Sequence, residues 1–299
     1  MKKFNLFLIG FAFLCCSSRM TFAQNNTETA NLFNEIDNSL KEINIEMVTC
    51  PAGSFLMGSP KAELGRLEPD ENSIWFNSDV SVKETQHKVT LTKSFQIAKF
   101  ELTQKQYNSI MSANPSEFKG DDLPVTNITK KDAEEFCNKL NEKFSKVLPK
   151  GYKFDLPTEA QWEYACRAGT ATALNNNKDL TTIEGKCPNL DEVAWYRGNT
   201  EGRSVHQVGL KMPNAWGIYD MHGNVCEICK DEYQDYSEED VVDPFGKKPA
   251  NRIRGFLYKG GDCRSIIGNC RSASRIDFQP RQIYANSYMG MRLAIVSAE

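Results

Sequence analysis

The stretch Leu156-Pro-Thr-Glu-Ala-Gln-Trp-Glu-Tyr-Ala-Cys-Arg-Ala-Gly169 is the part of this sequence that indicates its fold most directly. Thr158 followed by Gln161 forms a capping box, in which the hydroxyl accepts a first-turn amide and the glutamine side chain reaches back. The helix that would begin here carries its apolar residues on one side: Trp162, Ala165 and Cys166. The stretch therefore predicts a short amphipathic helix packed against a core.

The region before this stretch predicts two more helices and several strands. Capping boxes at Thr103 and Thr129 predict helices that begin there, the second with apolar residues at helical spacing. Alternating apolar residues predict strands over 88–92 and 95–98. Residues 47–57, with Pro-Ala-Gly in their middle, predict a β-hairpin, and residues 60–86 predict a long surface loop.

The region after residue 170 has few helix signals. Glycine, asparagine and proline interrupt it at short intervals, with only brief apolar runs between them. Such punctuation is typical of short strands held together by much irregular structure. We therefore predict an α+β fold with a high irregular content, formed as a single domain.

The first residues have the pattern of a signal peptide. A basic start, an apolar run to Cys16 and a small-residue cleavage site predict removal of residues 1–23. Lipid anchoring through Cys15 or Cys16 is the alternative, although no small residue precedes them. Residues 24–44 would be a leader segment with a short helix over 32–40, and residues 45–297 the domain. No later run reaches transmembrane length, so we expect a secreted or periplasmic bacterial protein.

Charge and cysteine content indicate which partners, disulfides and metal sites to expect. Beyond residue 23 the chain carries 33 basic and 39 acidic residues, with no basic block, so we expect no nucleic-acid partner. Eight cysteines remain beyond that point, and an even number in an exported protein favours disulfides. Cys226 and Cys229 have CxxC spacing, but no second ligand pair accompanies them as zinc requires.

Several long segments resemble the formylglycine-generating-enzyme, or sulfatase-modifying-factor, family. The resemblance runs in order over roughly residues 45–296 and is closest in 156–169 and in Pro213-Asn-Ala-Trp-Gly-Ile-Tyr-Asp-Met-His-Gly-Asn-Val-Cys-Glu227. It continues through Lys259-Gly-Gly261 and ends at Gly290-Met-Arg292. The fold that the resemblance implies is a C-type-lectin-like variant rich in irregular structure.

The resemblance also indicates which cysteines a catalytic member of the family would need. Family enzymes oxidise a sulfatase cysteine with a copper-binding cysteine pair, whose first member is the fourth residue after the paired glycines. Here that residue is Ser265, and the nearest cysteines, Cys263 and Cys270, are seven positions apart. Because Cu(I) prefers two closely placed thiolates, copper is not expected. If the chain were enzymatic, Cys263 and Cys270 would be the candidates and a sulfatase the partner.

Two structural features follow from the same resemblance. The Gly-Asn-Val-x-Glu segment resembles a calcium site, with Asn224, Val225 and Glu227 as the expected ligands. The alternative is that Asn224 and Glu227 only tie the loop by hydrogen bonds. The resemblance also implies a disulfide between Cys166 and Cys270.

Other polar residues have ordinary interpretations. His222 is a candidate base or a packed side chain, and Glu163 is expected to pair with Arg167 on the same helix. The three C-terminal arginines are expected to form internal ion pairs, with an anion site as the alternative: Arg271, Arg275 and Arg292.

Two classes of function remain open. The first is an accessory or binding module that presents the loops between Asp262 and Met289 to an unknown protein or glycan ligand. The second is a divergent oxidoreductase that converts a substrate cysteine to formylglycine.

Overall fold

The computed structural model describes residues 31–66, 83–201, 204–247, 256–278 and 287–298. Within these ranges, strands form two four-stranded sheets, one three-stranded sheet and one two-stranded sheet. The predicted signal peptide over residues 1–23 lies outside the described residues. Nowhere in the described part of the chain is there a helix with the length and apolar character needed to span a bilayer.

The three helices predicted from capping boxes are confirmed. They are α3 (Gln104–Met111), α4 (Lys130–Lys143) and α5 (Glu159–Arg167). Each follows a threonine whose hydroxyl accepts from the third helical amide, while the side chain at that third position accepts from the threonine amide. Two first-turn amides that the helix itself leaves without partners are thereby satisfied.

We expect Thr129→Ala to lower the free energy of unfolding by about 1 kcal/mol, the usual cost of removing such a cap. The hydroxyl of Thr129 accepts from the Asp132 amide at 3.2 Å and donates to the Asp132 carboxylate at 2.6 Å. Urea unfolding followed by circular dichroism measures the change. Thr129→Ser keeps the hydroxyl and should lose less than half as much; equal losses would mean that the methyl group, not the cap, is responsible.

The N-terminal segment is part of the domain core. Helix α2 (Asn34–Leu40) continues into the 3-10 turn η1 (Lys41–Ile43), where the sequence predicted a helix over 32–40. Phe33, Ile36 and Leu40 are fully buried in one cluster with side chains of α4 and the C-terminal strand. Part of the predicted leader segment, 24–44, therefore contributes to the core.

The predicted hairpin at residues 47–57 is wrong. Strand β1 (Met47–Cys50) pairs with β4 (Phe95–Ala98), whereas β2 (Gly53–Met57) pairs with β3 (His87–Leu91). Pro51 and Ala52 are therefore a bend in one long strand, which lies antiparallel to a second strand bent over residues 92–94. Proline occurs both at bends within a strand and in the turns of hairpins. The local sequence around Pro51 therefore did not distinguish a bend from a hairpin turn.

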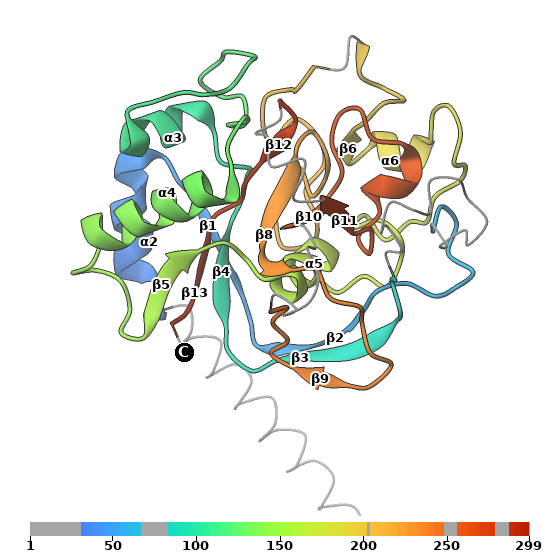
Figure 1. Cartoon of the computed structure of the whole chain (residues 1–299), viewed down its shortest axis with the longest axis horizontal. Helices are drawn as coiled ribbons and strands as arrows, with labels where there is room; N and C mark the ends of the chain where they lie inside the picture. The colour runs from blue at the N-terminus through green and yellow to red at the C-terminus, as the bar shows by residue number, and fades with distance from the viewer. Residues whose placement is uncertain (1–30, 67–82, 202–203, 248–255, 279–286, 299) are drawn as a thin grey trace, which may run out of the picture.

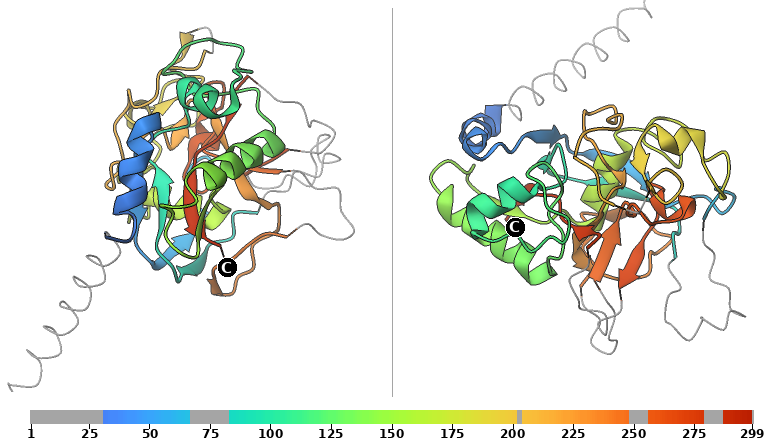
Figure 2. Two further views of the ribbon diagram at one scale, coloured as in Figure 1. Left: turned by 90° about the vertical axis from the view of Figure 1, so that its left-hand side faces the viewer. Right: turned by 90° about the horizontal axis from the view of Figure 1, so that it is seen from above.

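The central sheet has the order β1-β4-β13-β5, with β13 (Ala294–Ser297) between β4 and β5 (Tyr152–Asp155). Alternate residues of a strand point to opposite faces. Ile295 accordingly packs with α2 and α4, and Ala294 and Val296 pack with α5. The views in Figure 1 and Figure 2 show α2, α3 and α4 gathered on one side of this sheet, with α5 on the other.

The second four-stranded sheet carries the loop with the predicted calcium ligands. Its order is β11 (Ile276–Phe278), β10 (Phe256–Lys259), β8 (Cys226–Glu232) and β12 (Met289–Gly290). The other C-terminal elements are short, as predicted: α6 (Pro188–Asp191), β6 (Ala194–Trp195), β7 (His222–Gly223), β9 (Val241–Val242) and the 3-10 turn η3 (Ile267–Cys270).

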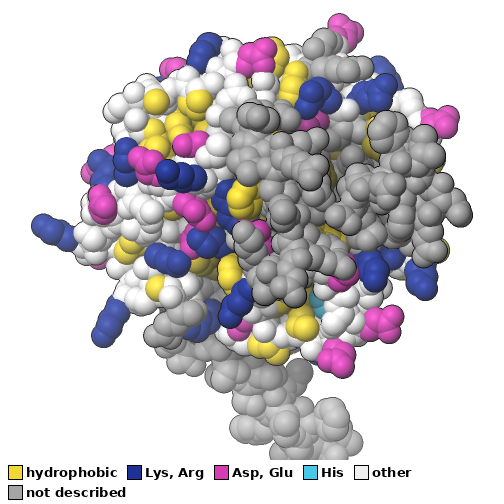
Figure 3. Space-filling view, in the orientation of Figure 1, with side chains coloured by type: hydrophobic (Ala, Val, Ile, Leu, Met, Phe, Trp, Pro, Cys, Tyr) yellow, Lys and Arg dark blue, Asp and Glu magenta, His cyan; other side chains and the backbone are white. Residues whose placement is uncertain are grey.

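The described ends of the predicted surface loop over 60–86 are only partly on the surface. Lys61 and Lys83 are exposed, as predicted, whereas Glu84 is buried. Both Glu84 and the half-buried Glu63 bind the buried guanidinium of Arg271. The surface prediction is therefore wrong for Glu84, while residues 67–82 lie outside the described part. On the face drawn in Figure 3, the charged side chains that are described have both signs and are interspersed.

Candidate functional site

The Gly223–Glu227 loop is the first candidate, and tight backbone packing fixes it. Gly223 adopts φ +77°, and a Cβ there would lie 2.0 Å from the Trp195 carbonyl oxygen, so only glycine fits. Asn224 follows with a left-handed φ of 59°, and its amide donates to the same Trp195 oxygen at 2.7 Å. The loop therefore enters β8 with its side chains held inside the molecule.

Glu227 is buried and bound to two side chains. Its carboxylate accepts from Nη2 of Arg292 at 2.6 Å and from Nε1 of Trp162 at 2.6 Å. Both partners are fully buried, so the pair lies in a medium where an unmatched charge would be costly. Trp162 of α5 and Arg292, just before β13, thus meet on one carboxylate of β8.

Asn224 and Val225 are tied to another buried carboxylate. Nδ2 of Asn224 donates to Glu101 at 2.6 Å, its Oδ1 accepts from the His206 amide at 2.8 Å, and the Val225 amide donates to Glu101 at 3.1 Å. Burial raises the pKa of Glu101 well above its usual value, and the nearby carboxylates of Asp220 and Glu227 raise it further. Sequence reasoning assigned no role at this site to Glu101, because it lies more than a hundred residues away along the chain.

The side chains of Asn224 and Glu227 are therefore engaged by other groups of the protein, whereas a calcium ion takes six to eight oxygens. Among the described residues, no group of three or more acidic, histidine or cysteine side chains is arranged to hold a metal. The hydrogen-bonding alternative for Asn224 and Glu227 describes this geometry better. One feature favours a bound cation instead: Oδ1 of Asp220 is buried with no hydrogen-bond partner in the described structure. Calcium at Asn224, Val225 and Glu227 remains a prediction.

The candidate catalytic cysteines are buried thiols. Cys263 packs with Val205 and Val225, whereas Cys270 packs with Cys187 and Ile267 in a different apolar cluster. Burial raises the pKa of Cys263 to about 12 and also raises that of Cys270. Both side chains are therefore protonated at neutral pH, and a thiol is a poor copper ligand compared with a thiolate.

The predicted disulfide is not formed in the structure. The eight described cysteines form no disulfide with one another, and all eight are buried. The thiol of Cys166 lies 3.6 Å from the Ser272 hydroxyl and 3.9 Å from Nε2 of His222, while that of Cys270 points to the Ile266 carbonyl.

The CxxC pair is divided between the two faces of β8. Cys226 packs in the cluster under α2 to α4, and Cys229 packs in the cluster around α5. Residues three apart on a strand point in opposite directions, so these sulfurs do not converge on a metal or on each other.

The expected ion pairs of the C-terminal arginines are confirmed, as is the pair between Glu163 and Arg167. Glu163 is fully buried and also binds the buried ammonium of Lys259 at 3.0 Å, a contact the sequence did not indicate. The acidic partners are Glu63 and Glu84 for Arg271, Glu159 for Arg275 and Glu227 for Arg292.

His222 is a packed residue in this structure. It is fully buried, its Nδ1 lies 2.6 Å from the Cys270 carbonyl oxygen, and its Nε2 accepts from the Asn175 amide at 3.1 Å. Both ring nitrogens are therefore engaged. Burial lowers the pKa of His222 to about 4, so the ring is neutral at neutral pH.

A groove of about 480 Å³ lies beside Ser265, at the position where the resemblance implies a cysteine. Ile183 and Ile266 are about half exposed there, which is unusual for large apolar side chains. The groove also has basic side chains and an aromatic one. Its lining is Ile183, Glu184, Gly185, Lys186, Tyr196, Arg197, Gly198, Ser265, Ile266 and Ile267.

These features define a class: an α+β domain whose irregular C-terminal half is held by buried arginine–carboxylate pairs. The family model of the Sulfatase-modifying factor enzyme 1-like domain matches residues 32–296, and the chain belongs to this family.

Relatives agree with that assignment. The chaperone protein LppX of Paenibacillus barcinonensis is 33% identical over 184 residues, covering 47% of this chain and 63% of LppX. The formylglycine-generating enzyme of Streptomyces coelicolor is 34% identical over 148 residues, covering 46% of each chain. This chain therefore spans less than two thirds of these curated relatives. Among solved structures, Treponema denticola variable protein 1 superposes with a TM-score of 0.65 at 26% identity, covering 84% of this chain and 94% of that one.

Proposed function

We propose that this chain is an exported ligand-binding or accessory module of the sulfatase-modifying-factor family, without formylglycine-generating activity. The observation that carries the proposal is the state of Cys263 and Cys270. Both thiols are buried, have raised pKa values and pack in separate clusters. A copper-dependent oxidation needs two thiolates on one metal, and burial keeps both of these groups as neutral thiols.

The groove beside Ser265 is the proposed binding site. Its volume lies within the usual range for ligand pockets, about 300–1,000 Å³. Half-exposed Ile183 and Ile266 would lose apolar surface to water on binding, while Lys186 and Arg197 would orient acidic or hydroxyl groups of a protein or glycan. The name of LppX, a chaperone protein, also supports an accessory role over catalysis.

We expect no aldehyde formation when the full chain is incubated with Cu(I), oxygen and a peptide containing Cys-x-Pro-x-Arg. Mass spectrometry of the peptide measures the reaction, and the Streptomyces coelicolor enzyme is the positive control. Iodoacetamide should also label Cys263 and Cys270 in the folded protein much more slowly than in urea, because buried thiols are protonated and shielded. Turnover that Cys263→Ser abolishes would refute the accessory role.

A further inference from the structure

We propose a second binding site, separate from the groove beside Ser265, for a small molecule whose flat ring carries hydroxyl donors, as phenols and sugars do. The site is a cavity of about 420 Å³ between β3, β9, the start of α5 and the end of β8. This volume lies within the usual range for ligand pockets, about 300–1,000 Å³. None of the described residues lines both the cavity and the groove beside Ser265, so each site can be tested without the other.

One imidazole in the lining has a nitrogen without a partner. His87, on β3, is 7% exposed and lines the cavity. Its Nδ1 lies 2.9 Å from the Thr85 carbonyl oxygen, which can only accept, so Nδ1 carries the proton. In the neutral ring Nε2 is therefore an acceptor, and it has no hydrogen-bond partner in the described part of the chain. A hydroxyl group that enters the cavity can donate to it.

The donors of the lining are already used within the protein. Four other residues there have donor side chains, and each donates to a carbonyl oxygen or a carboxylate. The pairs are Gln234 with the Lys247 carbonyl, Tyr236 with Glu159, Ser237 with the Glu239 carbonyl, and Arg275 with Glu159 and the carbonyls of Lys83 and Gln234. A ligand rich in acceptors would therefore find few partners.

Two further acceptors of the lining have room for a ligand. The bond from Nε2 of Gln234 leaves its Oε1 as the other end of the amide, with no donor in the described structure. Asp231 is 5% exposed, and its two oxygens accept one backbone amide each, from Gly246 at 2.8 Å and from Glu159 at 2.7 Å. A carboxylate oxygen can accept a second hydrogen bond. The match to a ligand with its own donors is one of hydrogen-bond roles and does not depend on a surplus of charge.

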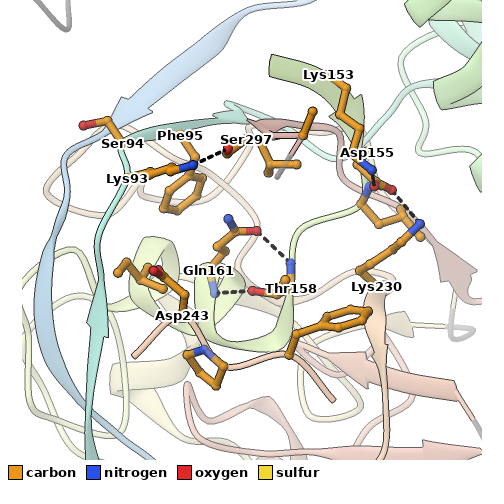
Figure 4. Close-up of a pocket in the computed structure, with 16 residues that line it drawn as sticks. Lys93, Ser94, Phe95, Lys153, Asp155, Thr158, Gln161, Lys230, Asp243 and Ser297 are labelled. Carbon is orange, nitrogen blue, oxygen red and sulfur yellow. Dashed lines mark hydrogen bonds and ion pairs between the residues drawn. The ribbon is translucent and has the colours of Figure 1, made fainter. Parts of the chain in front are cut away.

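The lining also has a place for the flat face of a ring. Met57, Val241 and Pro244 line the cavity, and so does Phe245, which is 44% exposed. A ring that packs against Phe245 would remove its own apolar surface and that of Phe245 from water. Pro244 and Phe245 also line the neighbouring cavity drawn in Figure 4, where Asp243 of the same segment is labelled.

The segment that carries Phe245 is fixed in place. Asp243 has a left-handed φ of 43°, and its carboxylate accepts from the Thr92 amide at 2.9 Å and from the Thr92 hydroxyl. Three residues later, the Gly246 amide donates to Asp231 at 2.8 Å and its carbonyl accepts from the Glu232 amide at 3.0 Å. Anchors on both sides mean that the cavity exists before a ligand arrives, which reduces the ordering cost of binding.

The test compares catechol, whose ring carries two hydroxyl donors, with its dimethyl ether, which has the same ring and oxygens but no donor. Each is titrated into the full chain by ligand-observed NMR at about pH 8, where Asp231 is ionised although burial raises its pKa to about 7. We expect catechol to bind about tenfold more tightly, since unmet hydrogen bonds commonly change affinity by that factor. Methyl glucoside distinguishes the two sources of hydroxyl groups: binding as tight as that of catechol would assign a sugar, and weaker binding a phenol.

Nitrogen NMR of the imidazole rings shows whether catechol reaches His87. The chain has three histidines, so each ring can be assigned. We expect the Nε2 signal of His87 to move with catechol and not with the dimethyl ether. His87→Phe keeps an aromatic ring beside Tyr236, whose centroid is 4.8 Å away, but removes the acceptor. It should weaken catechol about tenfold and leave the ether unchanged, whereas Phe245→Ala should weaken both.

Lys88→Ala is the matched control, because Lys88 follows His87 on β3 but is exposed and does not line the cavity. It should leave the binding of every probe unchanged, and thermal melting confirms that each variant folds. Equal affinity for catechol and its ether would overturn the proposal, as would a His87 signal that catechol does not move. Tighter binding of benzylamine than of catechol would mark a cation site instead. No binding of any probe at about 10 mM would also refute the proposal.

Discussion

Glu227→Gln is expected to lower the free energy of unfolding by about 3–5 kcal/mol, the usual cost of breaking a buried ion pair from one side. The substitution leaves the fully buried guanidinium of Arg292 without its negative partner and weakens the acceptor for Trp162. The loss should be the same in excess calcium and in a chelator, because the arginine supplies the interaction. Guanidinium chloride unfolding under both conditions measures it.

Glu135→Gln is the control for this substitution. Glu135 is exposed and pairs with Lys139 at 3.4 Å on the surface of α4, where such pairs contribute less than about 1 kcal/mol. If calcium binds the folded state alone, a concentration 100 times its dissociation constant would instead add about 2.7 kcal/mol to the original protein. A loss in Glu227→Gln that appears only with calcium would assign Glu227 to a metal and not to Arg292.

The second large effect is a dependence of stability on pH that comes from His222. Its pKa is lowered from 6.5 to about 4 in the folded protein by burial. As the pH falls from 6.5 to 4, the unfolded chain binds a proton at this residue and the folded chain does not, so stability is lost over that window. The shift corresponds to about 3 kcal/mol, since one pKa unit is about 1.4 kcal/mol.

His222→Gln removes this dependence, so the stability difference between the two proteins should shrink by about 3 kcal/mol from pH 7.5 to pH 4. Urea unfolding at a series of pH values measures it. Asp231→Asn is a control in which the expected dependence of stability on pH has the opposite sign. Burial raises the pKa of Asp231 from 3.8 to about 7, so its cost to stability grows as the pH rises through that range. A constant difference between the original protein and His222→Gln would show that the folded protein accepts the proton.

The parts of the fold that were predicted correctly depend on local chemistry. A capping box lies within four residues, and the threonines at 103, 129 and 158 begin helices as expected. The pairing of Glu163 with Arg167 is equally local, one helical turn apart. Even the short N-terminal helix could be located from its apolar spacing.

The parts that were missed depend on contacts between distant residues. Whether the chain forms a hairpin or only bends at Pro51 depends on which strands pair with β1 and β2. Those partners, β4 and β3, come about forty residues later in the sequence. Arg271 was expected to form an ion pair, but its partners Glu63 and Glu84 lie 208 and 187 residues away.

The position of β13 has a consequence for how the chain matures. This strand, residues 294–297, follows all the other described strands in sequence but lies inside the central sheet, between β4 and β5. Until residues 292–297 have been synthesised, the facing edges of β4 and β5 have no partner, and Arg292 has not reached Glu227. The central sheet therefore cannot form progressively in the order of synthesis. It is completed in a late step, when β13 inserts between two strands made long before.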